Sequence, residues 1–208
     1  NYCVGTQKHT MDSFMKLVRK ERFDVVHHHN ISLLGYNLLK KQGDYKNIYT
    51  AHDYWLVCHK YDLMKGPEMC TAKDCLSCCL RYKKPYQYFR KTQRFKEALR
   101  YIDEIIAPSK FMGDILREDF QSVKVIHNFI RNPLSSKKVL IGDYFIFAGA
   151  LIENKGILDL VEVFSRTDKK LVVVGRGEAE PELRSIIREK RIKNVELLGW
   201  KNQAELFP

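Results

Sequence analysis

The chain has 208 residues, and its 36 Lys and Arg residues outnumber 25 Asp and Glu residues, which gives a formal net charge of +11. Hydrophobic residues make up 45% of the chain and aromatic residues 12%, so a chain that is disordered throughout is excluded. No apolar run approaches the roughly 20 residues that span a bilayer. The positive charge indicates an anionic partner, and composition leaves nucleic acid, an anionic membrane and phosphate-bearing ligands open.

Short apolar runs alternate with amphipathic stretches in the first part of the chain. Apolar, β-branched runs predict strands at residues 24–28, 47–51, 104–107 and 123–126. Leucines at helical spacing predict a helix from Ile31 to Leu39 that ends near Gly43. Ser109 is expected to cap a helix over residues 110–117.

The same alternation returns after a break. Strands are predicted at 144–148, 170–174 and 195–198, with helices at 156–164 and 180–188. Residues 129–141 contain Asn-Pro, Ser-Ser and Lys-Lys pairs, which predict a linker between an N-terminal domain (1–128) and a C-terminal domain (142–208). The pattern predicts an α/β fold with parallel sheets. Both domains look incomplete, so we expect a fragment that lacks both ends.

Polar residues follow two strands of the first domain. The first strand ends in His27-His28-His29-Asn30, and the second runs into His52-Asp53. Ligands of open α/β sheets bind at the carboxyl ends of the strands. His52 and Asp53 are therefore candidates for an acid/base or hydrogen-bonding pair. Histidines that only pack against the sheet or face solvent are the alternative.

Glycine-bearing turns follow two strands of the second domain. Gly149 begins a loop that contains Lys155 and leads into a helix, where backbone amides and the lysine suit a phosphate. The order of a Walker loop is absent. Gly175-Arg176-Gly177 forms another glycine-rich turn, for which a simple tight turn is the alternative.

Five of the six cysteines lie in an apparent insertion, residues 58–79. Cys58, Cys70, Cys75 and Cys78 are spaced C-x11-C-x4-C-x2-C, which predicts a structural zinc site and, as a second choice, an iron–sulfur cluster. Reduced or disulfide-bonded cysteines remain the alternative.

Residues 81–100 carry eight Lys and Arg residues against the single acid Glu97, with five aromatic residues between them. This composition suits an anionic membrane surface. A solvated helix whose aromatic residues pack on the domain explains the pattern equally well.

Seven motifs in order resemble the retaining, nucleotide-sugar-dependent glycosyltransferases of family 4, which have the GT-B fold of two facing Rossmann-like domains. They are FDVVHHHN (23–30), IYTAHDYWLVC (48–58), IDEIIAPSKFMGDIL (102–116), VKVIHNFI (123–130), FAGALIENKGILDLVEVF (147–164), LVVVGRGEAEPEL (171–183) and NVELLGW (194–200). The resemblance implies that both Rossmann-like domains are present and that both are incomplete.

The resemblance also implies roles for the residues at the strand ends. His52, with Asp53 beside it, would lie at the reaction centre. His29, Asn30 and Ser109 would line the acceptor side of the cleft. The donor side would be formed by Gly149, Lys155, Gly175 and Arg176, with Lys155 paired to the donor diphosphate.

The implied reaction moves a sugar from a UDP- or GDP-sugar to a hydroxyl of a glycan or lipid-linked acceptor, with retention and without a catalytic metal. The protein would be cytoplasmic and peripheral on the membrane. Ala150 replaces a family arginine, and the family's paired glutamates are expected beyond Pro208. A catalytically silent relative is therefore one alternative, and a zinc-containing nucleic-acid-binding protein is another, although no nucleic-acid partner is expected.

Overall fold

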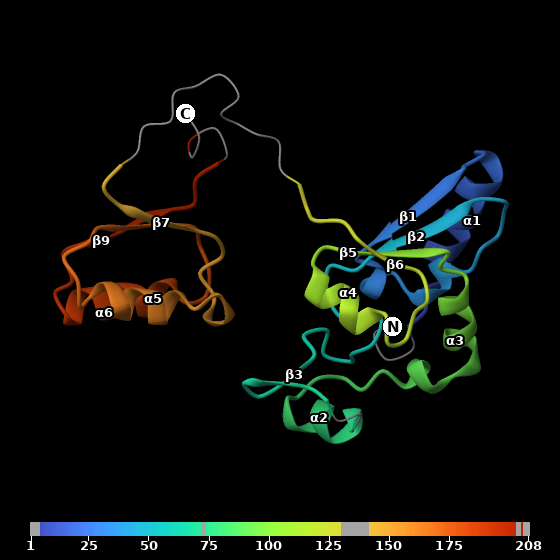
Figure 1. Ribbon diagram of the computed structural model, residues 1–208, viewed down its shortest axis with the longest axis horizontal. Coiled ribbons are helices and arrows are strands. Elements are labelled where there is room, and N and C mark those ends of the chain that lie inside the picture. The colour runs from blue at the N-terminus through green and yellow to red at the C-terminus, as the bar shows by residue number, and fades with distance from the viewer. Residues whose placement is uncertain (1–4, 72–73, 130–141, 203–204, 206–208) are drawn as a thin grey trace. The chain divides into compact units, whose positions relative to one another are not determined.

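The computed structural model describes residues 5–71, 74–129, 142–202 and 205. The chain divides into two compact units, Asn1–Phe129 and Ile130–Pro208, and each contains a parallel sheet (Figure 1). Apart from Phe129, the predicted linker at 129–141 lies outside the described residues.

The first unit is built on a four-stranded parallel sheet in the order β1-β2-β5-β6. These strands are β1 (Val25–His29), β2 (Lys46–Thr50), β5 (Glu104–Ala107) and β6 (Val123–Val125). The helices are α1 (Lys8–Lys20), α2 (Cys75–Arg81), α3 (Gln93–Arg100) and α4 (Lys110–Leu116), and β3 (Met64–Lys65) pairs with β4 (Glu68–Met69) in a hairpin. Tyr49, Trp55 and Phe95 lie in the core between the sheet and α3.

The second unit has the parallel strand order β7-β8-β9 among the described residues. The elements are β7 (Phe145–Ala148), α5 (Ile157–Phe164), β8 (Leu171–Val174), α6 (Glu180–Glu189) and β9 (Val195–Gly199). Every residue of β8 is buried, as its run of four apolar residues predicts for a central parallel strand. Helices α5 and α6 lie side by side on one face of this sheet (Figure 1).

The helix predicted from Ile31 to Leu39 is wrong. The structure has two 3₁₀ turns there, Ile31–Leu33 and Tyr36–Leu39, with Gly35 between them at φ 111°. A Cβ atom at Gly35 would lie 2.9 Å from the carbonyl oxygen of Gly5, so the two backbones approach closely. That approach and the positive φ break the helix, because neither suits a residue inside an α-helix.

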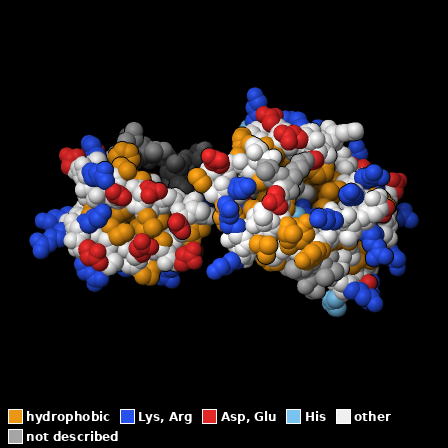
Figure 2. Space-filling view, turned by 90° about the horizontal axis from the view of Figure 1, so that it is seen from below, with side chains coloured by type: hydrophobic (Ala, Val, Ile, Leu, Met, Phe, Trp, Pro, Cys, Tyr) orange, Lys and Arg blue, Asp and Glu red, His pale blue; other side chains and the backbone are white. Residues whose placement is uncertain are grey.

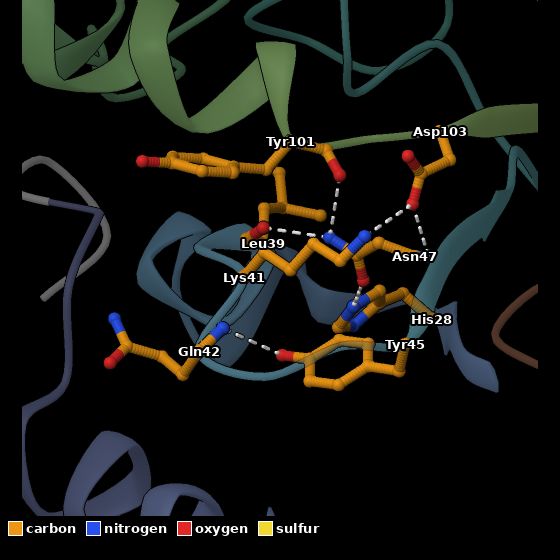
Figure 3. Close-up of polar contacts among 8 residues, drawn as sticks. All are labelled: His28, Leu39, Lys41, Gln42, Tyr45, Asn47, Tyr101 and Asp103. Carbon is orange, nitrogen blue, oxygen red and sulfur yellow. Dashed lines mark hydrogen bonds and ion pairs between the residues drawn. The ribbon is translucent and has the colours of Figure 1, made fainter. Parts of the chain in front are cut away.

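The side chain of Asn47 joins three segments at the amino end of β2 (Figure 3). Its Nδ2 donates to the carbonyls of Leu39 (2.7 Å) and Tyr101 (3.0 Å), and its Oδ1 accepts from Nε2 of His28 at 2.5 Å. Its backbone amide donates to the Asp103 carboxylate at 2.7 Å. Because Asn47 is fully buried, each of these bonds prevents the cost of an unpaired polar group.

Two buried histidines are held neutral in the folded chain. Burial is the main cause that lowers the pKa of His28. Burial, followed by the charges of Arg90 and Lys91, lowers the pKa of His59 from 6.5 to about 4. Nδ1 of His59 accepts the backbone amide of Gln87 at 3.1 Å, which requires a lone pair on that nitrogen.

These pKa shifts predict that the free energy of unfolding falls with acid. Below about pH 6.5 these histidines bind more protons in the unfolded chain than in the folded one. Their contribution to the free energy of unfolding is therefore fully present above that pH and is lost as the pH drops toward 4. Urea unfolding at a series of pH values measures this, and a His59→Gln variant should show a shallower dependence between pH 6.5 and 4. An unfolding free energy that is constant over this range would contradict the prediction.

The basic stretch at 81–100 is not one helix. After α2 ends at Arg81, a 3₁₀ turn (Tyr88–Lys91) and α3 follow. Phe89 and Phe95 are buried, as the packing alternative predicts. The guanidinium of Arg90 donates to the backbone carbonyls of Trp55, Leu56 and Cys58. In the part of the chain that the structure describes, no helix is long and apolar enough to cross a membrane.

Candidate functional site

Histidines gather at the carboxyl edge of the first sheet. Parallel pairing sets His29 of β1 opposite Thr50 of β2, two residues before His52. Nδ1 of His29 and Nε2 of His52 share a hydrogen bond of 2.8 Å, so one of these nitrogens carries a lone pair. Burial, and then the charges of His27 and His52, lower the pKa of His29. The lowered pKa favours a neutral imidazole at His29, which can accept or donate a hydrogen bond.

The other first-unit candidates lie near this edge in supporting positions. Oδ1 of Asp53 accepts the backbone amide of Trp55 at 2.8 Å, and within the described ranges no hydrogen bond joins Asp53 to His52. The structure therefore pairs His52 with His29. Asn30 adopts a left-handed conformation (φ 47°) that turns the chain at the end of β1. Oγ of Ser109 caps α4 by accepting the amide of Met112 at 3.2 Å.

His127 is a polar residue at this edge that the sequence analysis did not select. It lies two residues after β6, and its Nδ1 donates to the carbonyl of Pro108 at 3.0 Å. That bond joins the ends of β5 and β6 and leaves Nε2 for another contact. The signal was available, because His127 follows an apolar strand just as the first histidine cluster does.

The second unit has a cavity of about 460 Å³ at the carboxyl ends of β7, β8 and β9. It is lined by Ala148, Gly149, Ala150, Val174, Gly175, Arg176, Trp200 and Lys201. Sequence analysis missed Trp200 and Lys201, which directly follow β9. The cavity combines an exposed indole ring, cationic side chains and accessible backbone, which together suit a ligand with a flat ring and an anionic group.

Glycines shape this cavity in two ways. At Gly175 (φ 149°) a Cβ atom would collide with the carbonyl oxygen of Gly149, so this turn requires glycine for packing. At Gly149, by contrast, a Cβ atom would meet only the ring of Phe147, at an ordinary 3.6 Å. No protein contact therefore demands glycine at 149. Gly149 is one of the residues that line the cavity.

Cationic side chains follow each strand of the second sheet. Lys155 ends the 3₁₀ turn Glu153–Lys155 just before α5, Arg176 follows β8, and Lys201 follows β9. Lys201 pairs with Glu205 at 3.1 Å, whereas no ion pair within residues 142–202 and 205 engages Lys155 or Arg176. Arg176 and Lys201 line the cavity, and Lys155 does not. Fixed positive charge at this edge stabilises an anion.

The predicted metal ligands share one neighbourhood. Cys75 and Cys78 lie on one face of α2, Cys70 follows the β3–β4 hairpin, and Sγ of Cys58 accepts the amide of Lys60 at 3.4 Å. Burial is the main cause that raises the pKa of Cys75, and nearby Cys58, Cys70 and Cys78 raise it further. Cys58, Cys75 and Cys78 are free thiols. Among the described residues, no group of three or more His, Cys, Asp or Glu side chains has an arrangement that could hold a metal ion.

The sequence model of Glycosyltransferase Family 4 matches residues 9–131, which is more than half of the chain. This chain belongs to glycosyltransferase family 4. The match covers the β1 and β2 motifs and the histidine edge that they form. The resemblance inferred from the sequence motifs is therefore confirmed.

A curated relative and two solved structures agree with the family. An uncharacterized glycosyltransferase of Methanocaldococcus jannaschii, MJ1178, is 27% identical over 115 residues, which is 54% of this chain and 32% of the relative. TarM is 14% identical at a TM-score of 0.61, over 95% of this chain and 36% of TarM. Pneumococcal GtfA, an O-GlcNAc transferase in complex with UDP and GlcNAc, is 15% identical at a TM-score of 0.60, over 93% of this chain and 37% of GtfA.

The family match places the chain in the family, and the likeness to the solved structures shows the GT-B fold, as the motifs predict. The chain spans about a third of the length of these relatives. A mutant of S. aureus TarM was solved in complex with Fondaparinux, alpha-GlcNAc-glycerol and UDP.

Proposed function

We propose that the protein transfers a sugar from a UDP- or GDP-sugar to a hydroxyl of a glycan or lipid-linked acceptor, with retention of configuration. The observation that carries this proposal is the cavity at the carboxyl edge of the second sheet, which is lined by Gly149, Arg176, Trp200 and Lys201. TarM and GtfA were each solved with UDP, which supports a nucleotide donor.

In this proposal, the second unit binds the donor. Trp200, which is 62% exposed, offers a face on which a nucleobase can stack. Arg176 and Lys155 supply positive charge to the diphosphate, and the amide groups at the start of α5 add to it. As the glycosidic bond breaks, negative charge grows on the leaving diphosphate, and fixed cations stabilise that state more than the bound donor. No catalytic metal is needed for this step.

The first unit receives the acceptor in this proposal. The acceptor oxygen attacks the anomeric carbon on the face from which the diphosphate leaves, through an oxocarbenium-like state. His52 lies beside the reacting hydroxyl and is oriented by His29 through their 2.8 Å hydrogen bond. Asp53 stabilises the turn after β2 through its bond to Trp55, and Asn30 and Ser109 shape the neighbouring loops.

The test is a transfer assay with UDP-glucose, UDP-N-acetylglucosamine and GDP-mannose as separate donors and a panel of glycan and lipid-linked acceptors. We expect one donor to give a product whose new glycosidic bond keeps the donor's anomeric configuration, as NMR coupling constants show. An inverted product would contradict the mechanism. If the protein binds the nucleotide but transfers sugar from none of the donors, the result would instead favour a catalytically silent relative, which Ala150 supports.

We also propose that the protein acts at the cytoplasmic face of the membrane, where it meets lipid-linked acceptors. Support comes from the surplus of positive charge at residues 81–100. Phe89, Phe95 and Arg90 of this stretch are engaged in the core, so the exposed Lys and Arg residues would make the contact.

We propose further that the cysteine insertion binds a structural zinc ion. The spacing of Cys58, Cys70, Cys75 and Cys78 in the sequence supports this. Protein purified without added metal is expected to contain about one zinc per chain. A Cys75→Ser/Cys78→Ser variant should lose the metal, whereas Cys79→Ala, outside the proposed ligand set, should retain it. Elemental analysis that finds no zinc would contradict the proposal.

A further inference from the structure

A second and larger cavity, of about 850 Å³, lies in the first unit and has no part in the proposed sugar transfer. Asp103, which precedes β5, and Ser122, which precedes β6, both line it, so it lies toward the amino ends of these strands. The histidine edge is at the opposite, carboxyl end of the same sheet. The cavity is therefore separate from the candidate acceptor site.

One part of the cavity wall is apolar. Leu56 and Ile105 contribute from the buried core. Leu99, Ile102 and Phe120 pack against that core but are only partly buried. A wall of this kind gains free energy when a hydrocarbon chain covers it.

Another part of the wall is cationic. Lys91, Lys96 and Arg100 line the cavity and are exposed, and Lys96 and Arg100 lie one helical turn apart on α3. Across residues 5–71 and 74–129, the structure shows no ion pair for any of these three. The Arg90 guanidinium, which also lines the cavity, is directed at backbone carbonyls.

Few acidic groups offset these charges. Asp103 and Asp119 are the carboxylates in the wall, and Asp103 is engaged by the Lys41 ammonium at 3.5 Å and by the amide of Asn47. Three cationic side chains therefore line the cavity, and of its two carboxylates only Asp119 is not paired with Lys41. On the face of the first unit seen in Figure 2, Lys and Arg side chains similarly lie among hydrophobic ones. Clustered, unpaired cations of this kind attract an anion.

We propose that this cavity binds one molecule of an amphiphile with a phosphate or diphosphate head. The head contacts Lys91, Lys96 and Arg100, and the hydrocarbon part covers Leu99, Ile102 and Phe120. A cavity of this volume is large enough for a ligand of that size. This proposal rests on the proposed membrane association and gives it a specific ligand. It is tested by ligand binding, which does not depend on sugar transfer.

Calorimetry with dodecyl phosphate below its micelle concentration tests the proposal. We expect saturable binding at one site per chain. Inorganic phosphate, which lacks the chain, and dodecyl maltoside, which lacks the charge, should each bind at least about tenfold more weakly. A Lys96→Glu/Arg100→Glu variant should lose at least about tenfold in affinity for dodecyl phosphate, because two charge-assisted hydrogen bonds are replaced by repulsion. Equal binding of the neutral detergent, or no binding of dodecyl phosphate, would overturn the proposal.

The matched control is Lys84→Glu/Arg94→Glu, which makes the same charge change in the same basic stretch at exposed residues that do not line the cavity. It should bind dodecyl phosphate like the wild type. An equal loss of affinity in both variants would show that general surface charge, and not this cavity, binds the ligand. Sedimentation with phosphatidylglycerol vesicles then identifies the source of the ligand. A greater loss of sedimentation for the Lys96/Arg100 variant than for the Lys84/Arg94 variant indicates a bilayer lipid, and equal sedimentation of both variants indicates a soluble amphiphile. UDP binding should be unchanged throughout, which separates this site from the proposed donor site.

Discussion

Replacing Lys155 by alanine is expected to lower the rate of sugar transfer by about a hundred- to a thousandfold. The lysine ends the turn that leads into α5, and no ion pair among the described residues of the second unit neutralises it. Its charge is therefore available to the diphosphate as negative charge develops there. Because Ala150 supplies no second cation on this loop, the dependence on Lys155 should be strong.

Steady-state kinetics with the active donor measures this effect, and we expect kcat to fall more than donor affinity, because the interaction strengthens in the transition state. Lys193→Ala is the matched control. Lys193 is exposed and lies before β9, at the amino end of the sheet, so its loss should leave the rate unchanged. Turnover of the Lys155 variant near that of the wild type would show that the diphosphate role is wrong.

Replacing His52 by alanine should lower turnover by about a hundredfold or more, the usual range for a group that positions or exchanges a proton with a reacting hydroxyl. The structure places this imidazole at the end of β2 and ties it to His29. His29→Ala removes the partner that orients His52 but leaves His52 itself, so we expect a smaller loss, carried mainly by kcat.

The same assay compares these variants with His9→Ala, which removes an exposed histidine of α1 far along the chain from the site. That control should match the wild type, and all three variants should bind UDP normally, because the proposed donor cavity lies in the second unit. A larger effect of His29→Ala than of His52→Ala would make His29 the principal residue. Full activity of His52→Ala would remove the histidine edge from the mechanism.

The strands of the two parallel sheets were predictable because most of them are short apolar runs, whereas the short β3–β4 hairpin was not predicted. β5 was predicted with its observed bounds, and β8 and β9 within one residue at either end. Leu33, Leu34, Leu38 and Leu39 misled the helix prediction because their spacing fits an amphipathic face. In the structure Leu33 is 69% exposed and Leu39 is fully buried, since the close approach of Gly35 to Gly5 divides the segment.

The pairing of strands explains why the sequence alone did not predict the hydrogen bond at the histidine edge. The His29–His52 bond depends on β1 and β2 being neighbours in parallel register, which no local pattern specifies. The adjacency of His52 and Asp53 in sequence pointed instead to a pair that the structure does not form. Trp200 and Lys201 follow the rule that ligands bind at the carboxyl ends of strands, and applying it to the last strand would have found them.

The central claim is that the second unit binds a nucleotide diphosphate at the carboxyl edge of its sheet, and amide NMR during titration with UDP and GDP tests it most directly. The account predicts saturable shifts for one nucleotide at Gly149, Lys155, Gly175, Arg176 and Lys201, and no such shifts at Lys193 and Asn194, which precede β9. Shifts confined to the first unit, or none with either nucleotide, would contradict it.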